Sequence, residues 1–284
     1  MSRSYGIDRN RSSGKRSCAN LALGYKYKTV ESSPQDSQQS HRLGKAFAQS
    51  LVNQNKMVYI VDCDKNVLIE TVDEIGAAGY FVFDLANVSE LAEFSETVLK
   101  AVPEIDCLIN NAGIQMPLDF VEGADLSAAT KEINTNVMSL VHLCGLFVPH
   151  LVKKRACIMN FSSGLAYVPA SFAPVYSASM ASAFIKSFTV SLRDQLRSTN
   201  VKVIEIAPPL VQSNLHQHRD TKFKEFVTSN NITQLTQEEW ISALEKGLEE
   251  GSEEVGAGFS QLCIDKWKET FGPIHAKLSS VKPK

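Results

Sequence analysis

The 284-residue sequence lacks several features that would indicate other classes of protein. None of its apolar stretches approaches the roughly 20 residues that a membrane-spanning helix needs. Its first residues contain no continuous apolar segment of the kind found in signal peptides. The net charge is only −2, and beyond the first forty positions basic residues are dispersed among acidic ones, so no nucleic-acid surface is expected. These absences predict a cytoplasmic protein without nucleic-acid or membrane partners.

Metal-binding and disulfide patterns are also missing. The six cysteines show no C-x-x-C spacing, and four lie inside apolar runs, so we expect reduced thiols. His216 and His218 lie close together in the sequence, but no third ligand accompanies them. We interpret them as surface residues and expect no metal.

Residues 1–36 differ in composition from the rest of the chain. They are rich in Ser, Arg and Lys, and their only acids are Asp8, Glu31 and Asp36. A mitochondrial presequence has a similar composition, although no amphipathic helix stands out here. The alternative is a disordered tail or a misannotated segment, and it leads us to place the folded domain at residues 37–284.

Apolar strands and amphipathic helices alternate from about residue 43 onward. The sequence predicts strands at 57–61, 80–84, 107–110, 157–161, 201–207 and near 254–259. Asn87 with Glu90, and Thr236 with Glu239, have the spacing of helix-capping pairs. Repeated β-α-β units with nearly continuous apolar strands predict a parallel sheet covered on both faces. We therefore expect a single α/β domain with a doubly wound, Rossmann-like sheet that binds ligands beyond the carboxyl ends of its strands.

Four short segments carry polar residues at positions where such a sheet binds ligands. They are "INNAGI" at 109–114, "INTN" at 133–136, "FSSGLAYVPASFAPVYSAS" at 161–179 and "APPLVQS" at 207–213. Each alone is ambiguous, since Asn and Gly are common in turns and a single Asn on a helix is often solvated. Together, in this order and spacing, they resemble the short-chain dehydrogenase/reductase family. The details are most similar to a branch of oxidoreductases named after the teichoic-acid D-alanylation operon.

This resemblance implies an oxidoreductase that interconverts alcohols and carbonyl compounds with a nicotinamide cofactor. It assigns Tyr176 as the general acid/base, Ser163 as the hydrogen-bond donor to the substrate oxygen, and Asn136 as the residue that holds a proton-relay water. It also implies a homodimer or homotetramer built through helix faces. All three catalytic residues of the motif are present.

The resemblance also implies positions for the cofactor. It places Asn111, Ala112 and Gly113 beside the adenosine half, and Ser213 where the family usually has a Thr that meets the nicotinamide carboxamide. Proline at both 208 and 209 stands where Pro-Gly is common in the family.

Two acidic residues end neighbouring predicted strands. Asp62 lies eighteen residues after Gly44, the last glycine of the family's phosphate-binding loop. A carboxylate there accepts hydrogen bonds from a ribose diol and repels a 2′-phosphate, so it favours NAD over NADP. Asp84 ends the next strand, where the family contacts adenine; it is equally well interpreted as a turn-forming acid.

Met180 is the first departure from the family pattern. It occupies the position of a lysine that binds the nicotinamide ribose and lowers the tyrosine pKa. A nearby cation lowers such a pKa by roughly 1 to 3 units, so its loss reduces the reactive phenolate about 10- to 1000-fold at neutral pH. Lys186 lies ten residues past Tyr176, about 15 Å along a continuous helix, and does not substitute for it.

The phosphate-binding loop is the second departure. Aligned without a gap, the family's T-G-x-x-x-G-x-G falls on Ser37, Gln38, Arg42 and Gly44, so only the last glycine is retained. The segment before it, "YKYKTVESSPQD", lacks the apolar run of a central strand. Either the sheet is missing its middle strand, or residues 1 to about 40 are a wrong exon or a shifted reading frame.

Three interpretations follow. The chain is an NAD-dependent oxidoreductase weakened by Met180, or a pseudoenzyme that acts by binding and pairs with an active relative, or the product of a decaying gene. Both departures predict weak or lost dinucleotide binding. Residues 214–236, which should cover the substrate, are polar and indicate no particular substrate.

Overall fold

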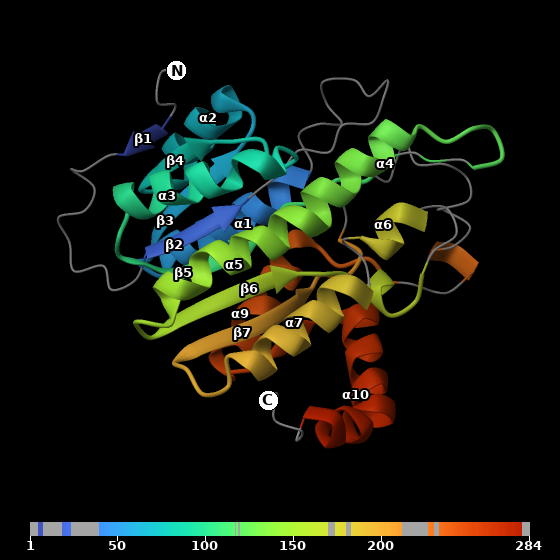
Figure 1. Ribbon diagram of the computed structural model, residues 1–284. Helices are drawn as coiled ribbons and strands as arrows, with labels where there is room; N and C mark the ends of the chain where they lie inside the picture. Colours follow the sequence, from blue (N-terminus) through green and yellow to red (C-terminus); the bar gives the residue numbers. More distant parts are fainter. Residues whose placement is uncertain are drawn as a thin grey trace.

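The computed structural model describes most of the chain. The described residues are 5–7, 19–23, 40–116, 118, 120–169, 174–179, 183–211, 227–229 and 233–279. They form an α/β domain in which helices cover both faces of one sheet, as the sequence predicts (Figure 1).

The sheet has eight described strands in the order β1-β4-β3-β2-β5-β6-β7-β8. They are β1 (Tyr5–Ile7), β2 (Ala19–Leu23), β3 (Met57–Asp62), β4 (Gly79–Val82), β5 (Ile105–Asn110), β6 (Ala156–Phe161), β7 (Val201–Ala207) and β8 (Glu254–Gly256). Only β1 is antiparallel to its neighbour. The chain order reverses between β2 and β5, and this reversal defines the switch point of a doubly wound sheet.

Three of the described helices cover each face of the sheet. On one face, α1 (Ser40–Asn53) contacts both α2 (Lys65–Ile75) and α9 (Gln237–Glu249). On the other, α3 (Leu91–Ala101) contacts α5 (Ser139–Leu151), and α7 (Ala183–Gln195) packs on β6 and β7 (Figure 1). The core between these layers includes Phe147 and Trp240, both 0% exposed.

The remaining described elements lie near the carboxyl edge of the sheet or beyond β8. They are η3 (Val88–Glu90), α4 (Leu126–Ile133), the π-turn η4 (Asn134–Met138), η5 (Gly164–Ala166), α6 (Pro174–Ala178) and the long helix α10 (Gly258–Ser279). In Figure 1, α10 extends away from the layered body towards the carboxyl terminus.

The middle strand of the sheet comes from the segment that the sequence assigned to a tail. β2 pairs in parallel with β3 on one side and with β5 on the other, where Leu23 lies opposite Asn110. The expectation of a missing middle strand is therefore wrong. It failed because the strand lies upstream of "YKYKTVESSPQD" and has only five residues. For the other residues of 1–36, and for the boundary at 37, the tail interpretation stays a prediction.

The predicted strands from residue 57 onward are confirmed to within a few residues at their ends. The Thr236–Glu239 capping box is confirmed by both of its hydrogen bonds. The Asn87–Glu90 pair is not: Asn87 makes no side-chain capping bond, and α3 begins at Leu91 after the short 3₁₀ turn η3. Here the 3₁₀ turn satisfies the backbone groups that a capping side chain would otherwise satisfy.

Candidate functional site

The candidate cofactor site lies at the carboxyl edge of the sheet, beside the switch point. Asp62 ends β3 there, and Asn111 follows β5 directly. Ligands of doubly wound sheets bind in the crevice at this point, where the strand order reverses. The predicted cofactor residues 62 and 111–113 are thus brought to the ends of β3 and β5, the two strands that flank β2.

Gly44 and Asn111 make a close approach that depends on the glycine. A Cβ added at Gly44 would lie 2.7 Å from the side-chain nitrogen of Asn111. The first turns of α1 therefore lie directly against the loop after β5. Arg42 lies inside α1, whereas Ser37 and Gln38 of the predicted loop lie outside the described residues.

Asp62 and Asp84 bind backbone groups of their own loops. Asp62 is 3% exposed, and its Oδ1 accepts a hydrogen bond from the backbone N–H of Asp64 at 2.9 Å. Burial raises its pKa to about 6, although the hydrogen bonds oppose this shift. The Oδ1 of Asp84 accepts from the backbone N–H of Ala86 at 2.9 Å, as the turn-forming interpretation expects.

Asn136 lies in the π-turn η4, where one extra residue is inserted between α4 and α5. Its Oδ1 accepts from the backbone N–H of Ile114, and its Nδ2 donates to the carbonyl of the same residue, both at 2.8 Å. The second Nδ2 proton is donated to Ser179 Oγ at 2.9 Å. Asn136 therefore fixes the loop after β5, and only its Oδ1 retains capacity to accept a bond from water.

Glu132 and Ser179 complete a buried polar cluster that the sequence did not reveal. The Oε2 of Glu132 accepts from the backbone N–H of Met116 at 2.8 Å, and its Oε1 lies 3.5 Å from Ser179 Oγ. Glu132 is 0% exposed, and burial raises its pKa to about 7. The cluster links the loop after β5, α4 and the residue that follows the short helix carrying Tyr176. The only signal in the sequence is that Glu132 and Asn136 are four residues apart.

Ser163 begins the η5 turn with its side chain in a position suited to donate a hydrogen bond. Its Oγ accepts from the backbone N–H of Leu165 at 3.3 Å, as an N-cap residue does. This bond uses an oxygen lone pair, and among the described residues no acceptor takes the hydroxyl proton, so it can be donated to a substrate oxygen. Helix α6, which carries the half-buried Tyr176, packs against this turn.

Glu205 binds both ends of the segment that contains Ser163. Ser162 Oγ donates to Oε1 of Glu205 at 2.7 Å, and the Tyr167 hydroxyl donates to Oε2 at 3.2 Å. Glu205 is 0% exposed. Burial, and then the carboxylates of Glu205 and Glu254, raise the pKa of Tyr167 far above its usual value, so it remains a neutral donor.

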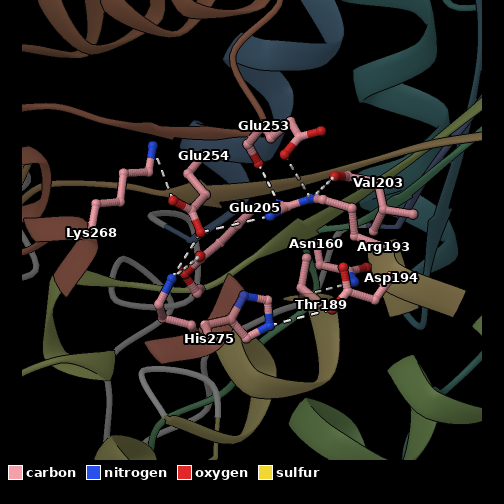
Figure 2. Close-up of polar contacts among 12 residues, drawn as sticks. Asn160, Thr189, Arg193, Asp194, Val203, Glu205, Glu253, Glu254, Lys268 and His275 are labelled. Carbon is pink, nitrogen blue, oxygen red and sulfur yellow. Dashed lines mark hydrogen bonds and ion pairs between the residues drawn. The ribbon is translucent and has the colours of Figure 1, made fainter. Parts of the chain in front are cut away.

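Glu254 lies beside Glu205 on the neighbouring strand, and cations surround both carboxylates. The Lys186 ammonium binds Glu205 Oε2 at 3.2 Å and Glu254 Oε1 at 2.9 Å. Figure 2 shows Lys268 reaching the other oxygen of Glu254, and this contact is 3.0 Å. Lys186 is thus engaged by two carboxylates and is unavailable to Tyr176.

Some of the predicted site residues lie outside the residues that the structure describes. Met180, Ser213 and most of 214–236 lie outside the described residues, as do His216 and His218. Within the residues that are described, no group of three or more His, Cys, Asp or Glu side chains could hold a metal ion. Nor does any helix in that part of the chain have the length and apolar character needed to cross a membrane.

Comparisons with known proteins agree with this geometry. The family model for short chain dehydrogenases matches residues 39–223. An uncharacterized oxidoreductase, DltE, from Bacillus subtilis is 40% identical over 174 residues, which are 61% of this chain and 66% of DltE.

Solved structures share the fold at low sequence identity. A short chain dehydrogenase/reductase from Burkholderia phymatum in complex with NAD has a TM-score of 0.67 and 16% identity, covering 92% of this chain and 96% of that one. A short-chain dehydrogenase from Sphingobium yanoikuyae in complex with NADPH has the same TM-score and 18% identity, covering 94% and 96%.

The largely parallel sheet with helices on both faces is a Rossmann-like fold, and the family match makes the assignment specific. The chain belongs to the short-chain dehydrogenase family. Within that family it lies in a branch similar to DltE.

Proposed function

We propose that this protein is an NAD-dependent oxidoreductase acting on a small alcohol or carbonyl compound, with its proton-transfer step weakened by Met180. The observation that supports it most is the Ser163 turn, in which the hydroxyl proton is available and Glu205 holds Ser162 and Tyr167 on either side. These hydrogen bonds on either side hold the Ser163 hydroxyl in a fixed position, from which it can donate to a substrate oxygen.

The residues at the carboxyl edge fit a nicotinamide dinucleotide. Gly44 permits the close approach of α1 to Asn111, and Asn136 fixes the loop that follows β5. Asn111, Ala112 and Gly113 would hold the adenosine half, with Asp62 at its ribose and Asp84 at its adenine. Ser213 would meet the carboxamide. Asp62 favours NAD over NADP, because a carboxylate repels a 2′-phosphate.

A bound nicotinamide supplies or accepts the hydride. In carbonyl reduction, Ser163 donates a hydrogen bond to the substrate oxygen, and Tyr176 gives that oxygen a proton. A water bound at Asn136 would return a proton to Tyr176. Met180 offers no charge to stabilise the tyrosinate, and Lys186 is held by Glu205 and Glu254. The proton step is therefore slow, and the ribose lacks one contact.

The second candidate is a pseudoenzyme that acts by binding a partner, and Met180 together with Gln38 and Arg42 favours it. Exposed apolar side chains support association through helix faces: Ile133 and Met138, beside α5, are 43% and 37% exposed. A homodimer or homotetramer, or a pairing with an active relative, would cover them.

One experiment separates the two candidates. Residues 24–44 are replaced by a loop with the T-G-x-x-x-G-x-G pattern, which leaves β2 in place, and Met180→Lys is made with and without this loop. With the loop, the lysine variant should reduce a panel of carbonyl compounds with NADH about 10²-fold faster than its methionine parent. Titration of each protein with NADH shows whether cofactor binding is restored.

Lysine alone should leave the intact chain nearly inactive. Equal rates for lysine and methionine in the chain that carries the new loop, with NADH bound by both, would contradict an acid/base step weakened at position 180. Low-micromolar NADH binding by the unaltered chain would show that Gln38 and Arg42 do not disable the loop.

A further inference from the structure

A hollow of about 670 Å³ lies between α7, α10 and the η5 turn. Ligand pockets for small molecules usually measure about 300–1,000 Å³. Neither Ser163 nor Tyr176 lines this α7–α10 hollow, so it is separate from the catalytic residues proposed above.

The walls of the hollow are largely apolar and aromatic. Helix α10 contributes Phe259, Trp267 and Phe271, and α7 contributes Val190. Tyr167 lines the wall at the η5 turn. Aromatic side chains bury large areas and stack on flat molecules, so these walls favour a ligand with an apolar ring system.

Lys186 provides a single buried donor in this apolar surface. It lines the hollow although it is only 4% exposed. Its ammonium has three N–H bonds, and the two carboxylates of Glu205 and Glu254 accept hydrogen bonds from it. Its Nζ also lies 4.0 Å from the ring centroid of Trp267, which lines the same hollow. Among the described residues, no further oxygen or nitrogen atom accepts a hydrogen bond from this ammonium.

The charges around the hollow select the head group of a ligand. A cationic ligand would be repelled by Lys186 and by Lys266, which also lines the hollow. An anionic head beside Lys186 would come close to the two buried carboxylates that already neutralise it. A neutral carbonyl or hydroxyl oxygen accepts the third N–H bond without either repulsion.

We propose that the α7–α10 hollow is a second small-molecule site, which takes a neutral, ring-containing compound whose oxygen accepts a hydrogen bond from Lys186. The aromatic walls bury the ring, and the ammonium orients its carbonyl or hydroxyl group. The site shares Glu205 with the segment around Ser163, because Glu205 binds both Lys186 and Ser162.

Trp267 makes the proposal directly testable. The chain has two tryptophans, and the other, Trp240, is 0% exposed and does not line the hollow. Full-length protein labelled with 5-fluorotryptophan should give two ¹⁹F resonances, which Trp267→Phe assigns. Without dinucleotide, the protein is titrated with 2-acetylnaphthalene, with 2-ethylnaphthalene, which lacks the acceptor, and with anionic 2-naphthoate.

The ketone should shift the Trp267 resonance and leave that of Trp240 nearly unchanged. It should bind roughly 10- to 100-fold more tightly than the ethyl compound, the usual effect of a hydrogen bond to a charged donor, and more tightly than the naphthoate. The ligand series replaces mutation of Lys186, because its loss would remove the cation that the buried Glu205 binds and would destabilise the protein itself.

Ser187→Phe tests the place of binding, because Ser187 is an exposed α7 residue that lines the hollow. This variant should bind the ketone at least 10-fold more weakly. Ser198→Phe, at an exposed serine outside the hollow, should bind it like the parent. Equal affinities for the ketone and the ethyl compound would overturn the role of Lys186. Unchanged binding of the ketone by Ser187→Phe would overturn the site. A Trp267 resonance that shifts only with protein concentration would also overturn it, and would assign the hollow to a second copy of this chain.

Discussion

Asn136 binds both backbone groups of Ile114, with its Oδ1 and Nδ2 each 2.8 Å from the atom that it contacts. The two residues belong to the π-turn η4 and to the loop after β5, so this side chain fixes the distance between a helix and the candidate cofactor loop. Because Asn136 is 1% exposed, water cannot replace either bond without entering the core.

Asn136→Leu should therefore reduce both stability and dinucleotide affinity. The buried N–H and C=O of Ile114 would lose their partners, at a cost of about 1–3 kcal/mol each. Urea unfolding measures the loss of stability. NADH titration measures the loss of affinity, in the loop-repaired chain, whose residues 24–44 are replaced by a loop with the T-G-x-x-x-G-x-G pattern. Gln49→Leu, at a half-buried residue on α1, controls for loss of an amide. A stable variant with unchanged affinity would show that the loop holds its position without Asn136.

Glu132 should make the protein less stable as the pH rises. Its pKa is about 7 in the folded protein and 4.5 when unperturbed, so the folded state keeps the proton that the unfolded state loses. The stability from protonated Glu132 is complete below pH 4.5 and is lost as the pH rises through 7, by about 3 kcal/mol in all.

Glu132→Gln keeps a neutral side chain at every pH and should remove this loss. When the free energy of unfolding is measured from pH 5 to 8, that of the variant should increase relative to that of the parent as the pH rises. Asp62, with a pKa of about 6, adds a decline of the same sign to both proteins, so the difference between them isolates Glu132. Glu96→Gln, at an exposed carboxylate on α3, should follow the parent curve. Parallel curves for Glu132→Gln and the parent would place its pKa near 4.5.

Lys186 and Lys268 both bind Glu254, but their removal should have very different costs. Lys186→Met leaves two buried carboxylates without their shared cation and should cost about 3–5 kcal/mol. Lys268 has a half-exposed side chain, and Lys268→Met should cost about 1 kcal/mol or less. Chemical denaturation at pH 7 compares the two, and equal costs would contradict the importance of burial.

The cost of Lys186→Met should also depend on pH. Burial alone would raise the pKa of Glu254, but Lys186 and Lys268 hold it below its usual value of 4.5. Its contribution is present above pH 4.5 and is lost as the pH falls through the lowered pKa. The stability difference between parent and variant should therefore be largest at neutral pH and shrink as the pH falls below 4.5.

Asp62→Ala should narrow the preference of the loop-repaired chain for NADH over NADPH. The substitution removes the repulsion of a 2′-phosphate and the acceptor for a ribose diol. The ratio of the two dissociation constants is the measurement. An unchanged ratio would remove Asp62 from the site, in agreement with its 3% exposure.

Two truncations test the middle of the sheet. Removal of residues 1–18 deletes β1 alone among the described strands and should leave a folded protein. Removal of residues 1–24 also deletes β2, which pairs on both sides, and should abolish cooperative thermal unfolding. Cooperative unfolding of the shorter chain at the same temperature would show that the remaining strands form the sheet without β2.

The strands could be predicted from the sequence where a single segment has a clear apolar pattern. β6 and β7 are nearly continuous apolar runs between amphipathic helices, and such strands are recognised by their length and neighbours. β2 has the sequence ANLAL, too short to stand out, and only its pairing with β3 and β5 defines it.

Contacts between distant residues could not be predicted. Lys186 meets Glu205 and Glu254 across 19 and 68 residues of sequence. One signal was available: Glu205 is a charged residue in the apolar run VKVIEIA, and such a residue in a buried strand requires a partner. The partner itself follows only from the packing of α7 on β7. The roles of Met180 and Ser213 remain predictions.

The position of β2 also affects how the protein is made. β2 is synthesised about 85 residues before its partner β5. At the usual translation rate of about 5–20 residues per second, one edge of β2 remains unpaired for roughly 4–17 s before β5 has been synthesised. During this time β3 can cover only the other edge. The nascent chain is therefore most exposed to mispairing before residue 110 has been made, and slower translation of the residues between β2 and β5 would lengthen the exposure.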